Sequence, residues 1–136
     1  MIFAFLLKTP FYDDIMKGRC SGGLYNGYVG FSGYLPSSYQ SGGSGELDDL
    51  INVHGGITFD RYVDLSVSWI IGKIPVADSK IPEKGIYRIV GFDTLHYNDT
   101  KYIWNLETVK SETKNLMIQI AEILAGNELK KLQGYG

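Results

Sequence analysis

The feature that most constrains the fold is a stripe of hydrophobic residues at helical spacing towards the end of the chain. Between residues 106 and 125 this stripe recurs every three or four positions, at Leu106, Val109, Thr113, Leu116, Ile120, Ile123 and Leu124. Such spacing is typical of an amphipathic helix that buries one face. Asn105 predicts the helix cap, and Gly126 predicts a left-handed end. We therefore expect one long helix packed on the rest of the chain.

Segments with strand-like patterns precede this helix. They alternate hydrophobic with polar residues, or are rich in β-branched and aromatic types, and both patterns favour strands. The expected strands comprise residues 24–31, 50–53, 57–62, 63–71 and 85–92, after an apolar opening at 1–8. Short helical turns are expected at 11–17 and 46–50, and a connector at 72–84. Strands followed by one long helix predict an α+β fold, with a mainly antiparallel sheet and the long C-terminal helix packed on it.

The length and composition of the chain predict a single domain over residues 1–136. A chain of 136 residues lies near the commonest domain size, and a hydrophobic share of 44% is enough for a sizeable core. Residues 32–45 are rich in Gly, Ser and Tyr and predict a flexible loop. This loop is either a surface linker or a lid that carries Tyr34 and Tyr39. The last residues, 134–136, predict a frayed tail.

Charge and cysteine content limit the class of protein. The formal net charge of −2 argues against broad nucleic-acid binding, which needs a basic surface that releases phosphate counterions. The single cysteine, Cys20, excludes an internal disulfide and fits a reducing cytoplasm. The apolar residues 1–7 are far fewer than the roughly 20 that span a membrane. We therefore expect a cytoplasmic protein with no membrane element.

The only two histidines, His54 and His96, each follow a predicted strand. If these strands lie in one sheet, both imidazoles can face one pocket together with Asp93 and Asp99. Such a group suits a divalent metal such as Zn, Mn or Fe, or metal-free acid–base catalysis. The alternative is structural, with the carboxylates shaping a turn. The candidates for catalysis or metal ligation are thus His54, Asp93, His96 and Asp99; no cofactor is expected, and a divalent metal is the alternative.

A ligand pocket is a third interpretation. Backbone amides at Gly55 and Gly56 can meet an anion, and Arg61 or Arg88 can pair with a phosphate. Aromatic side chains such as Tyr28 can stack on a base. The alternatives are a core role for the aromatic residues and solvated strand ends for the arginines. The expected ligand-binding residues are Tyr28, His54, Gly55, Gly56, Thr58, Arg61, Arg88, Asp93 and His96.

Three segments of the chain stand out as short motifs: GYVG at 27–30, HGGITF at 54–59 and GFDTLH at 91–96. They resemble the GYVG, HGG-[LI]-T-[FY] and GFD-x-x-H patterns of a group of small phage and prophage proteins that are functionally uncharacterised. The resemblance extends over residues 20–119. It implies a phage setting and marks a site, but it implies no particular reaction. Members often carry Cys where this chain has Thr94, so a mechanism that needs this thiol is not expected here.

Together these features predict a phage-encoded antagonist of bacterial defence that acts in the cytoplasm of the host cell. The leading hypothesis is a protein that binds and sequesters a nucleotide-derived immune signal. A second hypothesis is a small hydrolase that uses the His/Asp site, with or without a metal. A third is an anti-CRISPR-like inhibitor that binds a defence protein. The expected partner is therefore a small nucleotide-type ligand or a host defence protein, and a homodimer is the default assembly.

Overall fold

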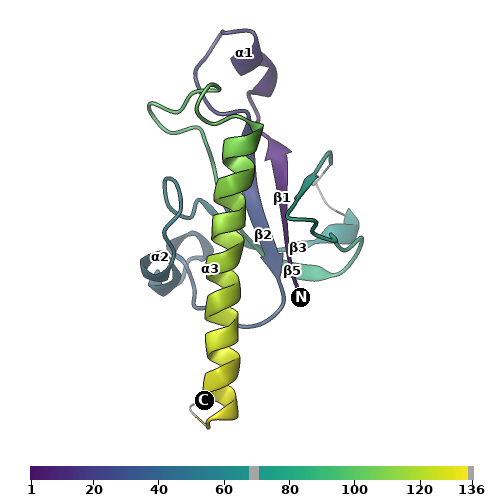
Figure 1. Cartoon of the computed structure of the whole chain (residues 1–136), viewed down its shortest axis with the longest axis vertical. Helices are drawn as coiled ribbons and strands as arrows, with labels where there is room; N and C mark the ends of the chain where they lie inside the picture. Colours follow the sequence, from purple (N-terminus) through teal and green to yellow (C-terminus); the bar gives the residue numbers. More distant parts are fainter. Residues whose placement is uncertain (68–70, 135–136) are drawn as a thin grey trace.

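The computed structural model describes residues 1–67 and 71–134, apart from the side chain of residue 131. A five-stranded sheet lies behind one long helix (Figure 1). The elements are β1 (Ile2–Lys8), α1 (Tyr12–Met16), β2 (Tyr25–Phe31), η1 (Tyr39–Ser41), α2 (Glu46–Leu50), β3 (Phe59–Asp64), η2 (Leu65–Val67), β4 (Ile74–Val76), β5 (Ile86–Phe92) and α3 (Leu106–Leu132). The strand order is β3-β5-β2-β1-β4, with antiparallel pairs throughout. The expected α+β fold, with its antiparallel sheet and long C-terminal helix, is confirmed.

Both faces of β1 are buried, which explains the uninterrupted apolar opening of the chain. Ala4 and Leu6 belong to the core on the α3 side, whereas Phe3 and Phe5 belong to the core on the other side. All four side chains are fully buried. A run without polar residues is typical of a strand that is covered on both faces. β1 accordingly lies inside the sheet, between β2 and β4.

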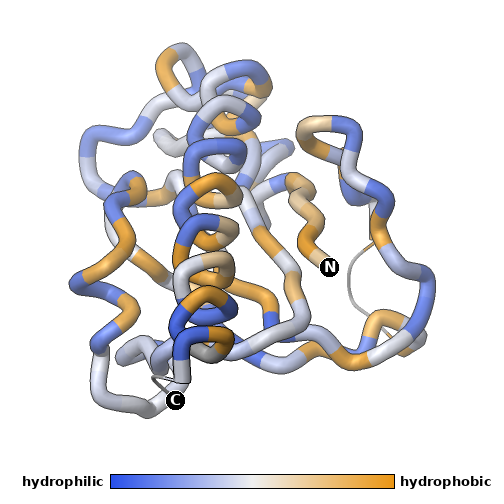
Figure 2. The backbone as a smooth tube through the Cα atoms, turned by 60° about the horizontal axis from the view of Figure 1, so that its bottom comes forward, coloured by the Kyte–Doolittle hydropathy of each residue, from blue (hydrophilic) through white to orange (hydrophobic). Residues whose placement is uncertain are grey.

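One face of the sheet is covered by α3, which buries the predicted stripe. Val109, Thr113, Leu116 and Ile120 are completely buried, and Figure 2 shows hydrophobic residues recurring along this helix. Gly27 of β2 lets the helix approach closely, because a Cβ there would lie 2.1 Å from Thr113 Oγ1. Burying one Val, Leu or Ile side chain contributes about 1.5–3 kcal/mol. This stripe therefore supplies much of the free energy that fixes α3 on the sheet.

The opposite face of the sheet carries a row of aromatic side chains. Phe5 stacks on Tyr28 with 5.4 Å between ring centroids, and Phe59 meets Tyr28 edge-on at 5.6 Å. Phe3 and Tyr87 make a further edge contact at 5.3 Å. Such pairs contribute about 0.5–1.5 kcal/mol each beyond the area that they bury. This face is therefore a second, aromatic core that spans four of the five strands.

Most of the other predicted segments correspond to observed elements. Residues 24–31 and 85–92 form β2 and β5, and 11–17 and 46–50 contain α1 and α2. The predicted cap is also present, since Asn105 Oδ1 accepts a hydrogen bond from the N–H of Thr108 at 3.1 Å. The connector at 72–84 contains one strand that the pattern did not predict, the edge strand β4, which pairs Val76 with Ala4 of β1. Three residues with Pro75 at their centre are too few to show a strand pattern.

The predicted strand over residues 63–71 is wrong beyond Asp64, although Val63 and Asp64 do belong to a strand. β3 extends from Phe59 to Asp64, and the next three residues form the helical turn η2. The Asp64 carboxylate accepts hydrogen bonds from the backbone N–H and the hydroxyl of Ser66, at 3.0 and 2.7 Å. Such local side-chain bonds compete with strand pairing, so the chain turns here although its hydrophobic residues alternate. Residues 68–70 of this prediction lie outside the described residues.

The predicted strand at residues 50–53 is also wrong. α2 extends to Leu50, and the backbone that follows bonds to α3 rather than to a strand. The N–H of Asn52 donates to Gln119 Oε1, and Gln119 Nε2 donates to the carbonyl of Asn52, both at 2.8 Å. The amide of Gln119 thus satisfies backbone groups that a neighbouring strand would otherwise satisfy. The segment therefore runs along the side of α3 and places His54 there.

The end of α3 differs from the prediction as well. The helix continues through Gly126 and ends at Leu132, and the left-handed residue is Gly134, with φ 79°. A glycine inside a helix costs about 1 kcal/mol relative to alanine. Beyond it, Asn127 Nδ2 donates to the carbonyl of Tyr34 at 2.9 Å, a contact that helps offset this cost. Among the residues that the structure describes, none of the helices combines the length and the apolar character needed to span a membrane.

Candidate functional site

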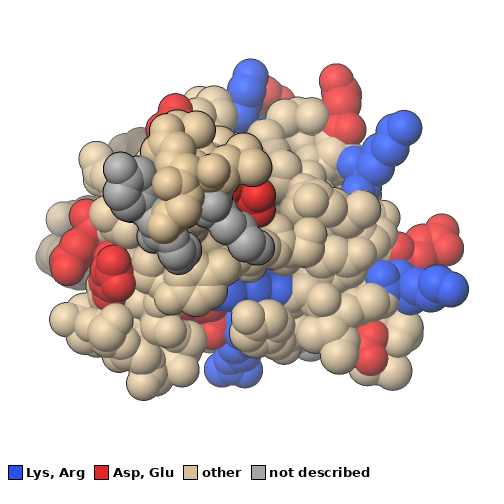
Figure 3. Space-filling view, turned by 90° about the horizontal axis from the view of Figure 1, so that it is seen from below, with Lys and Arg blue, Asp and Glu red and all other residues tan. Residues whose placement is uncertain are grey.

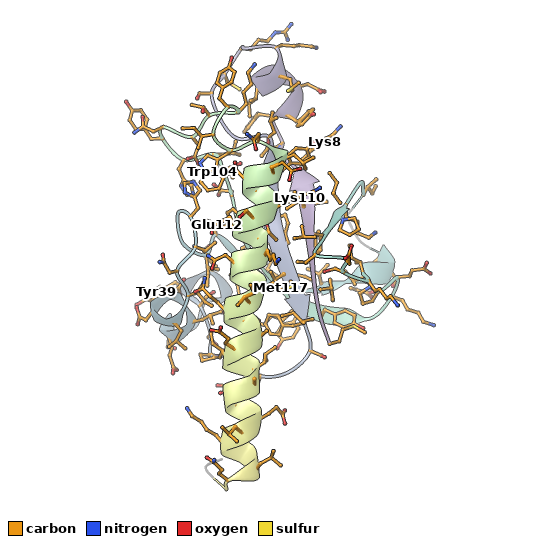
Figure 4. The ribbon with its side chains drawn as sticks, in the orientation of Figure 1. Lys8, Tyr39, Trp104, Lys110, Glu112 and Met117 are labelled. Carbon is orange, nitrogen blue, oxygen red and sulfur yellow. The ribbon has the colours of Figure 1, made fainter. Side chains whose placement is uncertain are left out.

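His54 lies at the tip of the segment that follows α2, beside the N-terminal half of α3. Its backbone N–H donates to Glu112 Oε2 at 3.0 Å. Its ring stacks on Trp104 with 3.9 Å between centroids and 29° between planes. Figure 4 shows Trp104 and Glu112 on the same side of α3. These two contacts fix both the backbone and the ring plane of His54.

Asp99 orients the same imidazole from the other direction. Its side chain is 5% exposed, and its two carboxylate oxygens lie 2.9 and 3.0 Å from His54 Nε2. Asp99 also closes its own turn, because Oδ2 accepts a hydrogen bond from the N–H of His96 at 3.0 Å. Asn98 completes this turn with a left-handed φ of 75°. Asp99 therefore shapes the turn and contacts an imidazole at the same time.

His96 lies beside His54, with ring centroids 5.4 Å apart and planes almost perpendicular, at 84°. Asp93 Oδ1 is 3.1 Å from His96 Nε2, but the direction of approach makes no hydrogen bond. This nitrogen is buried and has no hydrogen-bond partner within the described part of the chain. Asp93 Oδ1 accepts instead from the N–H of Leu95, at 3.1 Å. A buried polar atom left without a partner costs about 1–3 kcal/mol, so His96 Nε2 is an unusual feature of this site.

The turn at Gly55 and Gly56 allows the two histidine segments to meet. Both glycines are left-handed, with φ of 68° and 78°, which is favourable for glycine and strained for other residues. A Cβ on Gly55 would lie 2.1 Å from His96 Nε2. The N–H of Gly56 already donates to the carbonyl of Val53 at 2.9 Å. Gly55 therefore serves close packing against His96, whereas a Cβ on Gly56 would meet nothing within 4 Å. Contact of either glycine with an anion stays a prediction.

The structure thus brings together His54, His96, Asp93 and Asp99, which we call the histidine cluster. One ligand atom each from His54, His96 and Asp99 lie within 4.8 Å of one another. Glu112 adds a third carboxylate at the backbone of His54. Because three carboxylates surround two imidazoles, the cluster favours a cation over a phosphate. Whether these residues act in catalysis or in metal ligation stays a prediction.

Two further predicted ligand residues, Tyr28 and Thr58, border this region. Burial raises the pKa of the Tyr28 hydroxyl and the charge of Asp93 raises it further, against an opposing hydrogen bond with Asn26. The Tyr28 ring packs within the aromatic face of the sheet. The N–H of Thr58 donates to the carbonyl of Gly91 at 3.0 Å. Stacking of Tyr28 on a base would therefore replace aromatic contacts that the protein already makes.

Arg88 lies at the opposite end of β5 from His96, and its side chain is buried. Its guanidinium makes a two-pronged ion pair with Asp60, at 2.8 Å for each contact. It also donates to the carbonyls of Leu35 and Pro36, each at 2.8 Å. Burial alone would raise the pKa of Asp60, but hydrogen bonds from Arg88 and Ser38 outweigh burial and hold this pKa below its ordinary value. Arg88 thereby ties the 32–45 loop to the sheet.

Both predicted arginines line a cavity of about 520 Å³ between the 32–45 loop and β3, which we call the arginine cavity. Arg61 and Tyr34 are exposed at this cavity. Other lining residues were not predicted, among them Gln40, Ser41 and Tyr62. The only feature of the sequence that could have indicated these three residues is that they lie close in the chain to Tyr34, Tyr39 and Arg61.

The predicted ligand-binding residues therefore divide between two places. The histidine cluster and its surroundings contain Tyr28, His54, Gly55, Gly56, Thr58, Asp93 and His96, whereas Arg61 and Arg88 lie at the arginine cavity. The first place favours cations and the second offers arginine side chains, so one ligand is not expected to contact both. Comparison with known proteins found no matching family model, no matching curated protein and no matching solved structure.

Proposed function

We propose that this protein binds a small nucleotide-type anion in the arginine cavity and sequesters it without converting it. The cavity itself carries this proposal, because it joins Arg61, Arg88 and Tyr34 from separate segments of the chain. Its volume of about 520 Å³ lies within the roughly 300–1,000 Å³ of small-molecule sites. The resemblance to phage proteins supports the biological setting, in which the ligand is an immune signal of the infected bacterium.

Arg61 is the exposed arginine of the cavity lining. The charge of Arg88 is neutralised by Asp60, and its N–H groups point to protein oxygens. Arg61 is exposed, and its guanidinium lies 5.3 Å from the ring centroid of Phe59, a cation–π contact that limits its freedom. Figure 3 shows acidic and basic side chains interspersed on the face seen from below. Because this face has no broad positive charge, attraction of an anion must come from single groups such as Arg61. A guanidinium can pair with phosphate through two parallel hydrogen bonds.

Tyr34 supplies a surface on which a base can stack. This residue is 75% exposed, whereas its backbone is anchored on two sides. Arg88 bonds to the next two carbonyls, and Asn127 of α3 donates to the carbonyl of Tyr34 at 2.9 Å. An anchored backbone reduces the entropy lost when the ring meets a ligand. Stacking of one base on an aromatic side chain contributes about 1–3 kcal/mol.

The chemistry of the cavity favours binding over conversion. A general acid or base works best when its pKa lies near the operating pH. Asp60, the carboxylate that lines the cavity, has a lowered pKa and is bonded to both Arg88 and Ser38. At neutral pH it is therefore ionised and engaged, and it has no proton to donate. We accordingly expect the bound ligand to leave the cavity unchanged.

A binding experiment with a matched arginine control tests this proposal. The purified chain is titrated with a cyclic mononucleotide, a cyclic dinucleotide and ADP-ribose by isothermal calorimetry, and mass spectrometry then examines each mixture. We expect one probe at least to bind and to be recovered intact. Arg61→Ala should weaken binding about 10- to 100-fold, because a hydrogen bond to a charged group contributes about 1.5–3 kcal/mol.

The control is Arg19→Ala, which removes the same charge from an exposed arginine beside Asp14, away from the cavity lining. It should bind the probe as tightly as the unaltered chain. The proposal fails if no probe binds, or if the Arg61 and Arg19 variants bind equally well.

The histidine cluster favours a second candidate function, that of a small hydrolase. The 2.9 Å contact between His54 Nε2 and Asp99 is the geometry of a base oriented by a carboxylate. In that case the probe would be recovered cleaved, and His54→Gln would abolish cleavage. The third hypothesis, an inhibitor that binds a defence protein, would leave every nucleotide probe unbound.

A further inference from the structure

We infer that the histidine cluster is a binding site for a divalent transition-metal ion, held by His54, His96 and Asp99. This inference goes beyond the capture of an anion, and it does not depend on it. His96 follows the end of β5, whereas Arg88 lies near the start of the same strand, so the two sites use different parts of the sheet.

The spacing of the donor atoms is close to that of a coordination sphere. A tetrahedral ion with bonds of about 2.0–2.1 Å separates its ligand atoms by roughly 3.3 Å. His54 Nε2 and Asp99 Oδ1 are 2.9 Å apart, which is already near this value. With His96 included, the ligand atoms lie within 4.8 Å of one another. A movement of about 1.5 Å, small for a partly exposed imidazole, would complete a three-ligand site.

His96 Nε2 provides an independent indication. It is buried and makes no hydrogen bond within the described residues, although Asp93 Oδ1 is only 3.1 Å away. Such an atom costs free energy unless a partner is supplied, and a metal ion is a partner that accepts its lone pair. A glycine is needed at position 55 for the imidazole to take this place, because a Cβ there would lie 2.1 Å from Nε2.

The surroundings favour a cation and hold the ligands in place. Asp93 and Glu112 add negative charge beside the two imidazoles. Asp99 is fixed by the N–H of His96, and the ring of His54 is fixed by Trp104. Outer contacts of this kind orient metal ligands and strengthen binding.

The donor set also selects the class of ion. Two imidazoles and one carboxylate suit Zn²⁺, Mn²⁺ or Fe²⁺, whereas Ca²⁺ and Mg²⁺ prefer sites built from oxygen. The side chains of His54 and His96 are 24% and 35% exposed, so an ion can enter from solvent. Three protein ligands leave at least one position open for water or for a substrate oxygen.

Metal titrations of the full-length chain test the site directly. After treatment with EDTA and dialysis, the protein is titrated with Zn²⁺ by isothermal calorimetry and with Co²⁺ by visible absorption. We expect saturable binding of one equivalent of each ion, and no binding of Ca²⁺. His54→Gln and Asp99→Asn should each weaken Zn²⁺ binding at least about tenfold. His96→Gln should also weaken Zn²⁺ binding at least about tenfold. It removes a ring nitrogen that makes no hydrogen bond with the described residues, so this variant should keep its fold.

Two variants serve as controls. Arg61→Ala should bind Zn²⁺ as the unaltered chain does, because Arg61 belongs to the arginine cavity. Cys20→Ala should also bind normally, which would exclude the exposed thiol as the ligand. The inference is overturned if neither ion binds saturably, or if a folded His96→Gln variant binds Zn²⁺ with unchanged affinity. Failure of nucleotide binding, by contrast, would leave the metal result intact.

Discussion

The buried ion pair between Arg88 and Asp60 should be the polar interaction on which the 32–45 loop depends most. Replacing Arg88 by Met keeps a long apolar side chain but removes every hydrogen bond that the guanidinium makes. The carboxylate of Asp60, which is 2% exposed, would then lack its cation. The carbonyls of Leu35 and Pro36 would lose their donors as well.

The expected loss of stability follows from this geometry. Breaking a buried ion pair by removing one partner costs about 3–5 kcal/mol. Loss of the hydrogen bonds to the carbonyls of Leu35 and Pro36 adds little to this free-energy cost, because the loop can detach and these carbonyls can then bond to water. For 136 residues, at about 2.1 cal/mol/K per residue, the entropy of unfolding is roughly 0.29 kcal/mol/K. Arg88→Met should therefore lower the melting temperature by about 10–17 °C.

Thermal unfolding followed by circular dichroism measures this effect, and Arg61→Met is the matched control. Arg61 is exposed on the adjacent strand, so its replacement should change stability by only about 0.5 kcal/mol. The double variant Asp60→Leu with Arg88→Met leaves no charge unpaired and should be more stable than Arg88→Met alone. If Arg88→Met and Arg61→Met melted within a few degrees of each other, the structural role given to Arg88 would be refuted.

Three further predictions concern the packing, the helix cap and the response to acid. Gly27→Ala should destabilise the fold by about 1–3 kcal/mol in urea, because the added Cβ would lie 2.1 Å from Thr113 Oγ1; an unchanged urea midpoint would contradict this close approach. Asn105→Ala should cost about 0.5–2 kcal/mol in the same assay through loss of the cap, and no loss would mean that the cap bond contributes nothing. Because the folded pKa of Asp60 lies below the unfolded value of about 3.9, its ion pair contributes fully above about pH 4 and is lost as the pH falls through the folded pKa. Denaturant titrations between about pH 6 and pH 2.5 should show this loss, and Asp60→Asn should reduce it; an equal acid response in both proteins would argue against it.

The long helix α3 could be predicted because its hydrophobic pattern is local in the sequence. The stripe from Leu106 to Leu124 specifies α3, because its hydrophobic members recur at helical spacing and all pack into one core. The meeting of His54 with His96 was also predictable in outline, since each follows a hydrophobic segment that the core must bury. The route by which His54 reaches this place was not, because it depends on the bonds between Asn52 and Gln119.

The burial of Arg88 and the arginine cavity could not be predicted, because both depend on contacts between distant segments of the chain. Arg88 suggested a phosphate ligand because arginines are usually exposed, yet it is buried against Asp60, twenty-eight positions away in the chain. The arginine cavity exists because the 32–45 loop folds back on β3 and β5, where Ser38 donates to Asp60 and Arg88 donates to the carbonyls of Leu35 and Pro36. The composition of the loop does not reveal these contacts. The end of β3 at Asp64 has a local cause instead: two hydrogen bonds from Ser66 to the Asp64 carboxylate, which a hydrophobic pattern does not reveal.

The central claim, capture of an anion in the arginine cavity, is tested most directly by a site-resolved titration. A ¹⁵N-labelled sample is titrated with the nucleotide probes, and the backbone amide shifts are followed by NMR. Binding as proposed would move the amides of residues 33–41 and 60–62 and leave those of 54–56 and 96–99 unchanged. Shifts centred on the histidine cluster, or no shifts with any probe, would contradict the account.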